Sequence, residues 1–254
     1  MCDRLDKMKL TIEEEETIAI SDEGRLEAIE SCTSSLIGKF LTCKSFNKVA
    51  TKNTIRHAWG LNESMQILEV GPNFFQFKFQ SEFDLERILR GGPWSFDNQL
   101  LLLQRWKKGM TVGNIRLELA SLWVQIWDAP FDMVSPHVAR EVGSHLGKVE
   151  EVECKKRKDD ISMFMRVQVA LPIAKPIRRG GFIARLDGGK TWVSFKYERL
   201  PIFCHYCGIL GHDLRHCAAH YAVEKKSERI EYQHGDFLRA VGGRPRTLSA
   251  KASG

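Results

Sequence analysis

The sequence has no stretch that approaches the roughly 20 consecutive apolar residues needed to cross a lipid bilayer. Its densest apolar run is short, the four leucines at 100–103. We therefore expect no membrane-spanning segment and no membrane partner. The N-terminus also lacks the apolar region of a signal peptide and runs into four glutamates at 13–16. A reducing compartment, either the nucleus or the cytoplasm, is the expected location.

Familiar catalytic motifs are missing as well. The chain contains no P-loop, no H-E-x-x-H motif, no G-x-S-x-G nucleophile elbow and no dinucleotide-binding fingerprint. Asp159 and Asp160 are adjacent in a basic turn, but the sequence places no third carboxylate with them, so a two-metal nuclease or polymerase site is not expected. We expect that the chain is not an enzyme.

The charge is small overall but unevenly distributed. The total is +6, yet the first thirty residues hold ten acids and four bases, a balance of −6 that leaves +12 for the rest of the chain. An acidic lead of this kind is typical of a solvated segment or of one exposed helix. The basic remainder favours an anionic partner.

Residues 34–108 alternate between strand-like and helix-like patterns. The expected elements are strands at 36–43, 65–70, 74–80 and 98–106 and helices at about 46–60 and 81–90. Ser81 followed by Asp84 resembles a capping box, and the residues Gly91-Gly92-Pro93 stop the second helix. The order β-α-β-β-α-β is the split βαβ or ferredoxin-like arrangement, which also underlies RNA-recognition (RRM) modules.

A second unit over residues 119–200 repeats this order in part. The expected elements are strands at 122–127, 149–154, 163–171, 182–186 and 191–197 and a helix from 135 to 147. Ser135-Pro136 provides the N-cap and first turn of that helix, and Asp187-Gly188-Gly189 predicts a hairpin turn. The final helix of the unit is missing or replaced by residues 172–181. The predicted fold class is α+β.

A C-x2-C-x4-H-x4-C motif follows the second unit. Its candidate metal ligands are Cys204, Cys207, His212 and Cys217. Three thiolates and one imidazole complete a tetrahedral zinc shell with no open position for a reacting water, so we expect one structural Zn²⁺. A unit this short cannot build an apolar core, so its folding depends on the metal. His216 could take the place of His212, and the sequence does not decide between them.

The motif and the residues before it resemble a group of plant proteins. Residues 197–217 are similar to the zinc knuckle of proteins in which an uncharacterised N-terminal domain precedes a CCHC knuckle, many of them retrotransposon-derived. Upstream, residues 36–39, 91–94 and 123–127 resemble that domain, so the similarity runs over roughly residues 36–217. The resemblance implies nucleic-acid binding, a relation to non-LTR retrotransposon machinery, and no catalytic activity.

Side chains around the knuckle suggest how it would meet nucleic acid. Tyr206 and Leu210 can form an apolar platform on which a base stacks, while Arg199 and Arg215 meet phosphate. The alternative is that apolar residues such as Leu210 and Leu214 pack the knuckle against its neighbour. That alternative leaves a role in protein contact open.

The second unit offers a further candidate surface. Alternation along its first and third strands places aromatic and basic side chains on one face, namely Trp123, Trp127, Phe164 and Arg166. In RRM-like topology these strands are adjacent at the centre of the sheet, where single-stranded bases stack. The alternative is that this face is buried against the first unit or the strand of Trp192. In the first unit Phe75, Phe77 and Phe79 share a face, but we expect them in the core.

The clearest basic cluster is the run at the tip of the hairpin of the second unit, Lys155, Lys156, Arg157 and Lys158. Such a loop could bind phosphates or be recognised by nuclear import factors, and a solvated turn is the alternative.

Five segments are predicted along the chain: an acidic lead (1–33), two α+β units (34–108 and 119–200), a knuckle (201–219) and a basic tail without structure (220–254). The predicted function is zinc-dependent binding of single-stranded RNA or DNA, and the alternative is a zinc-stabilised protein interaction adaptor.

Overall fold

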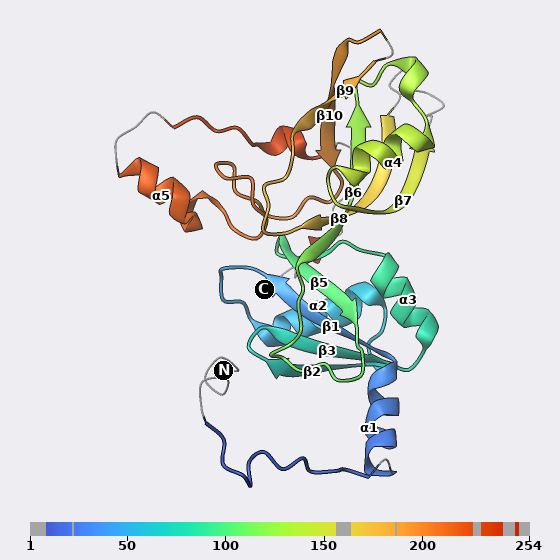
Figure 1. Cartoon of the computed structure of the whole chain (residues 1–254), viewed down its shortest axis with the longest axis vertical. Helices are drawn as coiled ribbons and strands as arrows, with labels where there is room; N and C mark the ends of the chain where they lie inside the picture. Colours follow the sequence, from blue (N-terminus) through green and yellow to red (C-terminus); the bar gives the residue numbers. More distant parts are fainter. Residues whose placement is uncertain are drawn as a thin grey trace, which may run out of the picture.

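The computed structural model describes residues 9–21, 23–155, 164–185, 187–225, 230–240 and 247–248. Two α+β units lie one above the other along the longest axis of the molecule, and the Cys/His segment (residues 201–219) packs with the second unit (Figure 1). No helix in the described part of the chain is long and apolar enough to cross a membrane. The predicted fold class, α+β with two split βαβ units and a small Cys/His cluster, is confirmed.

The acidic lead ends in one exposed helix, α1 (Glu23–Thr33), which buries no residue. Residues 9–21 before it are exposed throughout. At its C-terminal end the helix meets the first sheet, where Lys78 Nζ donates to Ser31 Oγ at 2.6 Å. The described part of the acidic lead, residues 9–21 and 23–33, is thus largely exposed to solvent.

The first unit has the predicted order of elements. These are β1 (Ser35–Leu41), α2 (Lys48–Trp59), β2 (Met65–Gly71), β3 (Phe74–Phe79), α3 (Glu82–Arg90) and β5 (Gln99–Arg105). The sheet order is β11-β4-β5-β1-β3-β2. The sequence missed β4 (Trp94–Phe96), because three residues are too few for an alternating pattern, and β11 (Thr247–Leu248), which pairs with β4 in parallel.

Both helices of this unit pack on one face of its sheet, and polar caps fix where they begin. The side chain of Asn47 accepts two backbone N–H groups at the start of α2, which ends at Gly60 in the left-handed region with φ 67°. Ser81 Oγ accepts the Phe83 N–H at the start of α3, as its capping pattern predicts. The core includes the three phenylalanines expected there, Phe75, Phe77 and Phe79.

The second unit follows the same plan with one helix fewer. Its elements are β6 (Leu119–Trp127), the 3-10 turn η2 (Phe131–Met133), α4 (Pro136–Ser144), β7 (Lys148–Lys155), β8 (Phe164–Pro172), β9 (Gly180–Ala184) and β10 (Lys190–Tyr197). The sheet order is β7-β8-β6-β10-β9, so β6 and β8 are adjacent at the centre as predicted. Residues 173–179 contain no helix, in agreement with the predicted replacement.

Apolar side chains from several segments complete the core of the second unit. Beside the strands and α4, this core contains Ile177, Leu200, Phe203, Leu210 and Leu238. Leu100 and Leu102 of β5 reach into the same core from the first unit. The Cys/His segment is therefore packed into the domain rather than carried on a free tether, and the two units share apolar contacts.

The linker between the units lies against the face of the first sheet that the helices leave open. Met110 Sδ lies 3.9 Å from Gln104 Nε2 on β5. Val112 packs on β2 so closely that a Cβ at Gly71 would come within 3.0 Å of Val112 Cγ1. Ile115 is buried. The chain itself thus covers part of the face through which an RRM-like sheet would be read.

The segment after residue 217 differs from the structureless tail that the sequence predicts. Residues 218–224 form α5 (Ala218–Glu224), and residues 230–240 return to the second unit (Figure 1). There the Ala240 N–H donates to the Tyr197 carbonyl at 3.0 Å, and Leu238 is fully buried. The few apolar residues of this stretch, such as Phe237 and Leu238, follow neither a helical nor a strand period, which is why the sequence missed this contact. Residues 241–246 and 249–254 lie outside the described part of the chain.

Candidate zinc knuckle and nucleic-acid interface

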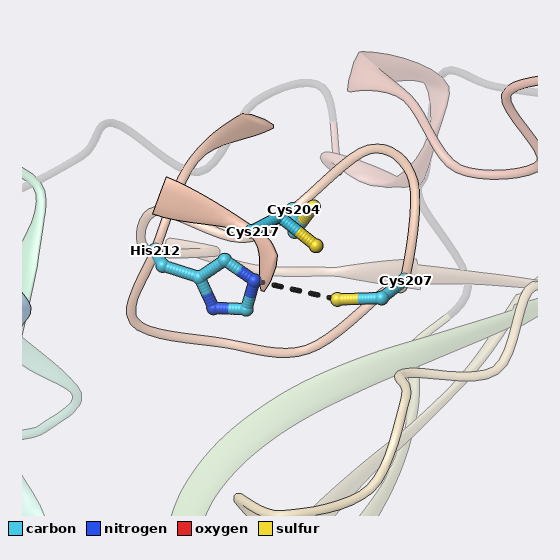
Figure 2. A group of neighbouring side chains, drawn as sticks. All are labelled: Cys204, Cys207, His212 and Cys217. Atoms are coloured by element: carbon cyan, nitrogen blue, oxygen red, sulfur yellow. Dashed lines mark hydrogen bonds between the residues drawn. The ribbon is translucent and has the colours of Figure 1, made fainter. Parts of the chain in front are cut away.

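The four predicted metal ligands come together at one point. The ligand atoms of Cys204, Cys207, His212 and Cys217 all lie within 4.8 Å of one another. Figure 2 shows His212 and Cys207 pointing toward each other, with 3.4 Å between His212 Nε2 and Cys207 Sγ. A tetrahedral zinc shell with Zn–S bonds of about 2.3 Å places its sulfurs about 3.8 Å apart. The residues present therefore fit one structural zinc ion.

The backbone around the first two cysteines forms a tight turn. Gly208 N–H donates to the Cys204 carbonyl at 2.8 Å, and Cys204 N–H donates to the Ile209 carbonyl at 2.9 Å. Gly208 and Gly211 have φ of 72° and 91°, in the left-handed region that glycine adopts without strain. These two glycines let the chain reverse so that Cys207 and His212 face each other.

Cys207 needs a nearby cation to stay ionised at neutral pH. Burial raises the pKa of the Cys207 thiol to about 12. A Zn²⁺ ion at this point would supply the positive charge that keeps the thiolates ionised at neutral pH. A backbone N–H also stabilises one of the thiolates, since the His220 N–H donates to Cys217 Sγ at 3.4 Å.

The structure also distinguishes the two candidate histidines. His216 Nδ1 lies 2.6 Å from Asp213 Oδ1, away from the sulfurs, whereas His212 is part of the ligand cluster. The hydrogen bond with His216, together with the ion pair to Lys44, holds the pKa of Asp213 well below its usual range. His216 is thus engaged outside the cluster, and His212 is the ligand that the geometry supports.

The predicted nucleic-acid contacts of the knuckle have different environments. Leu210 is only 3% exposed, so it packs into the shared core and offers no face to a base, which corrects its predicted role. Arg199 donates to the Gly91 carbonyl at 3.1 Å and so links the two units instead of standing ready for phosphate. Tyr206 is half-buried and meets the edge of the His220 ring, whereas Arg215 is exposed.

The predicted surface of the second sheet is assembled on one face, but its members are partnered within the chain. The guanidinium of Arg166 lies 3.6 Å from the ring centroid of Trp123. Arg166 also pairs with Glu153 at 2.9 Å and with Glu198 at 2.8 Å. Two carboxylates offset its charge, so Arg166 is poorly placed to hold a phosphate.

The other two aromatic side chains of this face contact each other. The rings of Trp127 and Phe164 are stacked at 4.7 Å, and Lys196 Nζ lies 4.8 Å from the ring of Trp127. Phe164 is only 8% exposed, so it supports Trp127 and has no free face for a base. Trp127 Nε1–H donates to Gln125 Oε1 at 3.0 Å, which fixes the indole in place.

A hollow of about 680 Å³ lies between the units at the Trp123 end of this face. The first unit contributes Arg90 and Leu102, and the second contributes Glu150 and Glu151 beside Trp123. The predicted alternative, burial against the first unit, thus applies in part to Trp123. The two glutamates make the hollow unfavourable for phosphate groups.

The remaining predicted contacts are in the basic hairpin. Lys155 ends β7, and its side chain and residues 156–158 lie outside the described residues. Two further residues of this face were not among the predicted contacts, Lys196 beside Trp127 and Glu198 beside Arg166. The period-two alternation of β10, which places both opposite the buried Phe195 and Tyr197, could have identified them.

Comparison with known proteins agrees with this geometry. Residues 28–114 match the family model described as a domain of unknown function, DUF4283, and residues 171–219 match the model described as a zinc knuckle. The chain carries a DUF4283 domain followed by a CCHC zinc knuckle. The DUF4283 match takes in the whole first unit and most of the linker on its open face, and the knuckle match begins before β9.

An uncharacterised protein of Arabidopsis thaliana is 28% identical over 134 residues, which is 53% of this chain and 42% of that protein, so the match spans less than half of the relative.

Among solved structures, a Sxl-lethal protein/RNA complex has 10% identity and a TM-score of 0.27, covering 65% of this chain and 98% of that one. The first two RRM domains of the yeast poly(U)-binding protein Pub1 have 9% identity and a TM-score of 0.22, covering 64% of this chain and 98% of that one. These scores are low, and the strand orders described above carry the assignment of the fold.

Proposed function

We propose that this protein binds single-stranded nucleic acid, RNA or DNA, that it catalyses no reaction, and that it is of retrotransposon origin. The observation that carries the proposal is a four-ligand zinc knuckle packed into the core of an RRM-like unit. Knuckles and RRM-like sheets both read unpaired bases by stacking and hold the backbone by charge. A closed Cys3His shell has no position for a reacting water, which supports a binding role.

Binding of this kind has a measurable signature. Each phosphate neutralised on a single strand contributes a slope of about −0.7 to the dependence of log affinity on log salt. Fluorescence anisotropy with labelled single-stranded RNA and DNA, titrated at several salt concentrations, should give saturable binding that weakens with salt. A duplex of the same sequence serves as the control and should compete poorly. Undetectable or salt-insensitive binding would overturn the proposal.

The alternative is a zinc-stabilised adaptor for protein partners. It is favoured by the acidic N-terminal segment, which exposes the apolar side chains of Ile12, Ile18 and Ile20. Under this alternative, removal of residues 1–21 would abolish partner capture without affecting the nucleic-acid titration. The origin of the chain has a separate test, since a retrotransposon-derived gene should lie beside a reading frame for an endonuclease or a reverse transcriptase.

A further inference from the structure

Three aromatic side chains near the β9–β10 edge of the second sheet are exposed and play no part in the core. Phe182 on β9 and Trp192 on β10 pack edge to face, with 5.1 Å between ring centroids, and are 69% and 42% exposed. Phe237, from the segment that returns after the knuckle, is 60% exposed and lines the same hollow of about 470 Å³ as Trp192. We call Phe182, Trp192 and Phe237 the edge cluster.

The backbone around the edge cluster is built to hold it. Trp192 lies so close to β9 that a Cβ at Gly180 would come within 2.4 Å of its Cζ2, so only glycine fits beneath the ring. Phe237 is placed by its neighbours on both sides. Leu238 is buried in the core, and Arg239 Nε donates to Asp236 Oδ1 at 2.9 Å.

Charge around the edge cluster favours an anion. Residues 172–197 contain six bases and one acid. Arg179 and Lys196 line the hollow, and within the described residues neither forms an ion pair with a carboxylate. Asp236, also in the lining, is paired with Arg239. The opposite edge strand, β7, has three glutamates, Glu150, Glu151 and Glu153, between the lysines at its two ends.

We infer that the edge cluster, with Arg179 and Lys196, is the site at which unpaired bases stack and the backbone of a single strand is held. Exposed ring faces next to cations that no carboxylate among the described residues neutralises are the combination that single-stranded nucleic acids require. The centre of the sheet lacks this combination, because Arg166 covers Trp123 and Phe164 covers one face of Trp127. This inference rests on the proposed function and places the main contact with the single strand at the β9–β10 edge of the sheet.

The test compares matched aromatic variants of the full zinc-loaded chain. Trp192→Ala and Phe237→Ala should each weaken binding of a labelled single-stranded oligonucleotide by roughly five- to 150-fold, the range for one lost base stack. Phe83→Ala is the control, because Phe83 is 75% exposed on α3 between Glu82 and Asp84, where an anion is disfavoured. Its affinity should stay within twofold of the original. Circular dichroism and zinc content should be unchanged in all three.

Charge variants add a second readout. Arg179→Gln and Lys196→Gln should each reduce the salt slope by about 0.7 if one phosphate contact is lost. Should the unaltered protein bind no single strand at all, the proposed function fails and the inference fails with it. If the unaltered protein binds but both aromatic variants bind equally well, the inference alone is overturned. A change in sedimentation mass with unchanged oligonucleotide affinity would likewise overturn it, by assigning the cluster to self-association.

Discussion

Replacement of Leu210 separates a packing role for the knuckle from a base-stacking role. Leu210 is 3% exposed and belongs to the core shared by the second unit and the Cys/His segment. Truncation of a buried leucine to alanine costs about 2 to 5 kcal/mol, because transfer free energy is lost and a cavity remains. We expect Leu210→Ala to lower the free energy of unfolding of the zinc-loaded protein by that amount.

The assay is urea unfolding followed by tryptophan fluorescence, with oligonucleotide affinity measured on the folded variant. Leu214→Ala is the matched control, because Leu214 belongs to the same knuckle but is only half-buried, and its cost should be about 1 kcal/mol or less. Affinity should be unchanged in both variants. A Leu210→Ala protein of unaltered stability that binds more than fivefold more weakly would refute the packing argument.

Three further predictions follow from the same contacts. Removal of zinc with a chelator should unfold residues 201–219. It should also release residues 230–240, because the His234 N–H donates to the His205 carbonyl. Limited proteolysis should then cut both segments while the first unit stays intact. Gly211→Ala should destabilise the protein more than Gly109→Ala. Both glycines have positive φ, so each alanine adds a backbone strain of about 1 to 3 kcal/mol, but only the Cβ at position 211 would also come within 2.6 Å of Leu41. Equal losses of stability in thermal unfolding would contradict this. Arg166→Gln should lower the free energy of unfolding by about 1 to 3 kcal/mol, because Glu153 and Glu198 lose their shared cation. Adding Glu198→Gln to the same chain should recover part of that loss. A double-mutant cycle with no coupling energy would argue against the ion pair.

The sequence predicted those parts of the fold that repeat with a clear period. Alternation in β6 and β8 and the polar cap Ser81 gave the strands, the helix start and the central pairing of the second sheet correctly. The ligand set was also predicted, because the spacing of the four ligands and the two glycines at Gly208 and Gly211 are local features. All of these residues lie within residues 204–217, so the sequence spacing alone was enough to identify them.

The sequence could not predict partners that lie far apart along the chain. Glu198 is 32 residues from Arg166, and its pairing with that guanidinium depends on β10 lying beside β6. The burial of Leu210 depends on Ile177 and Leu238, which belong to the same core but are distant from it in the sequence. Residue type alone therefore suggested contacts with nucleic acid for side chains that the folded chain uses for itself.

The most direct test of the account is the affinity of a labelled single-stranded RNA for the full chain, measured by anisotropy before chelation, after chelation and after zinc is restored. We predict binding that weakens with salt, is lost when zinc is removed and returns when zinc is added back. Affinity that is independent of both salt and zinc would contradict the account.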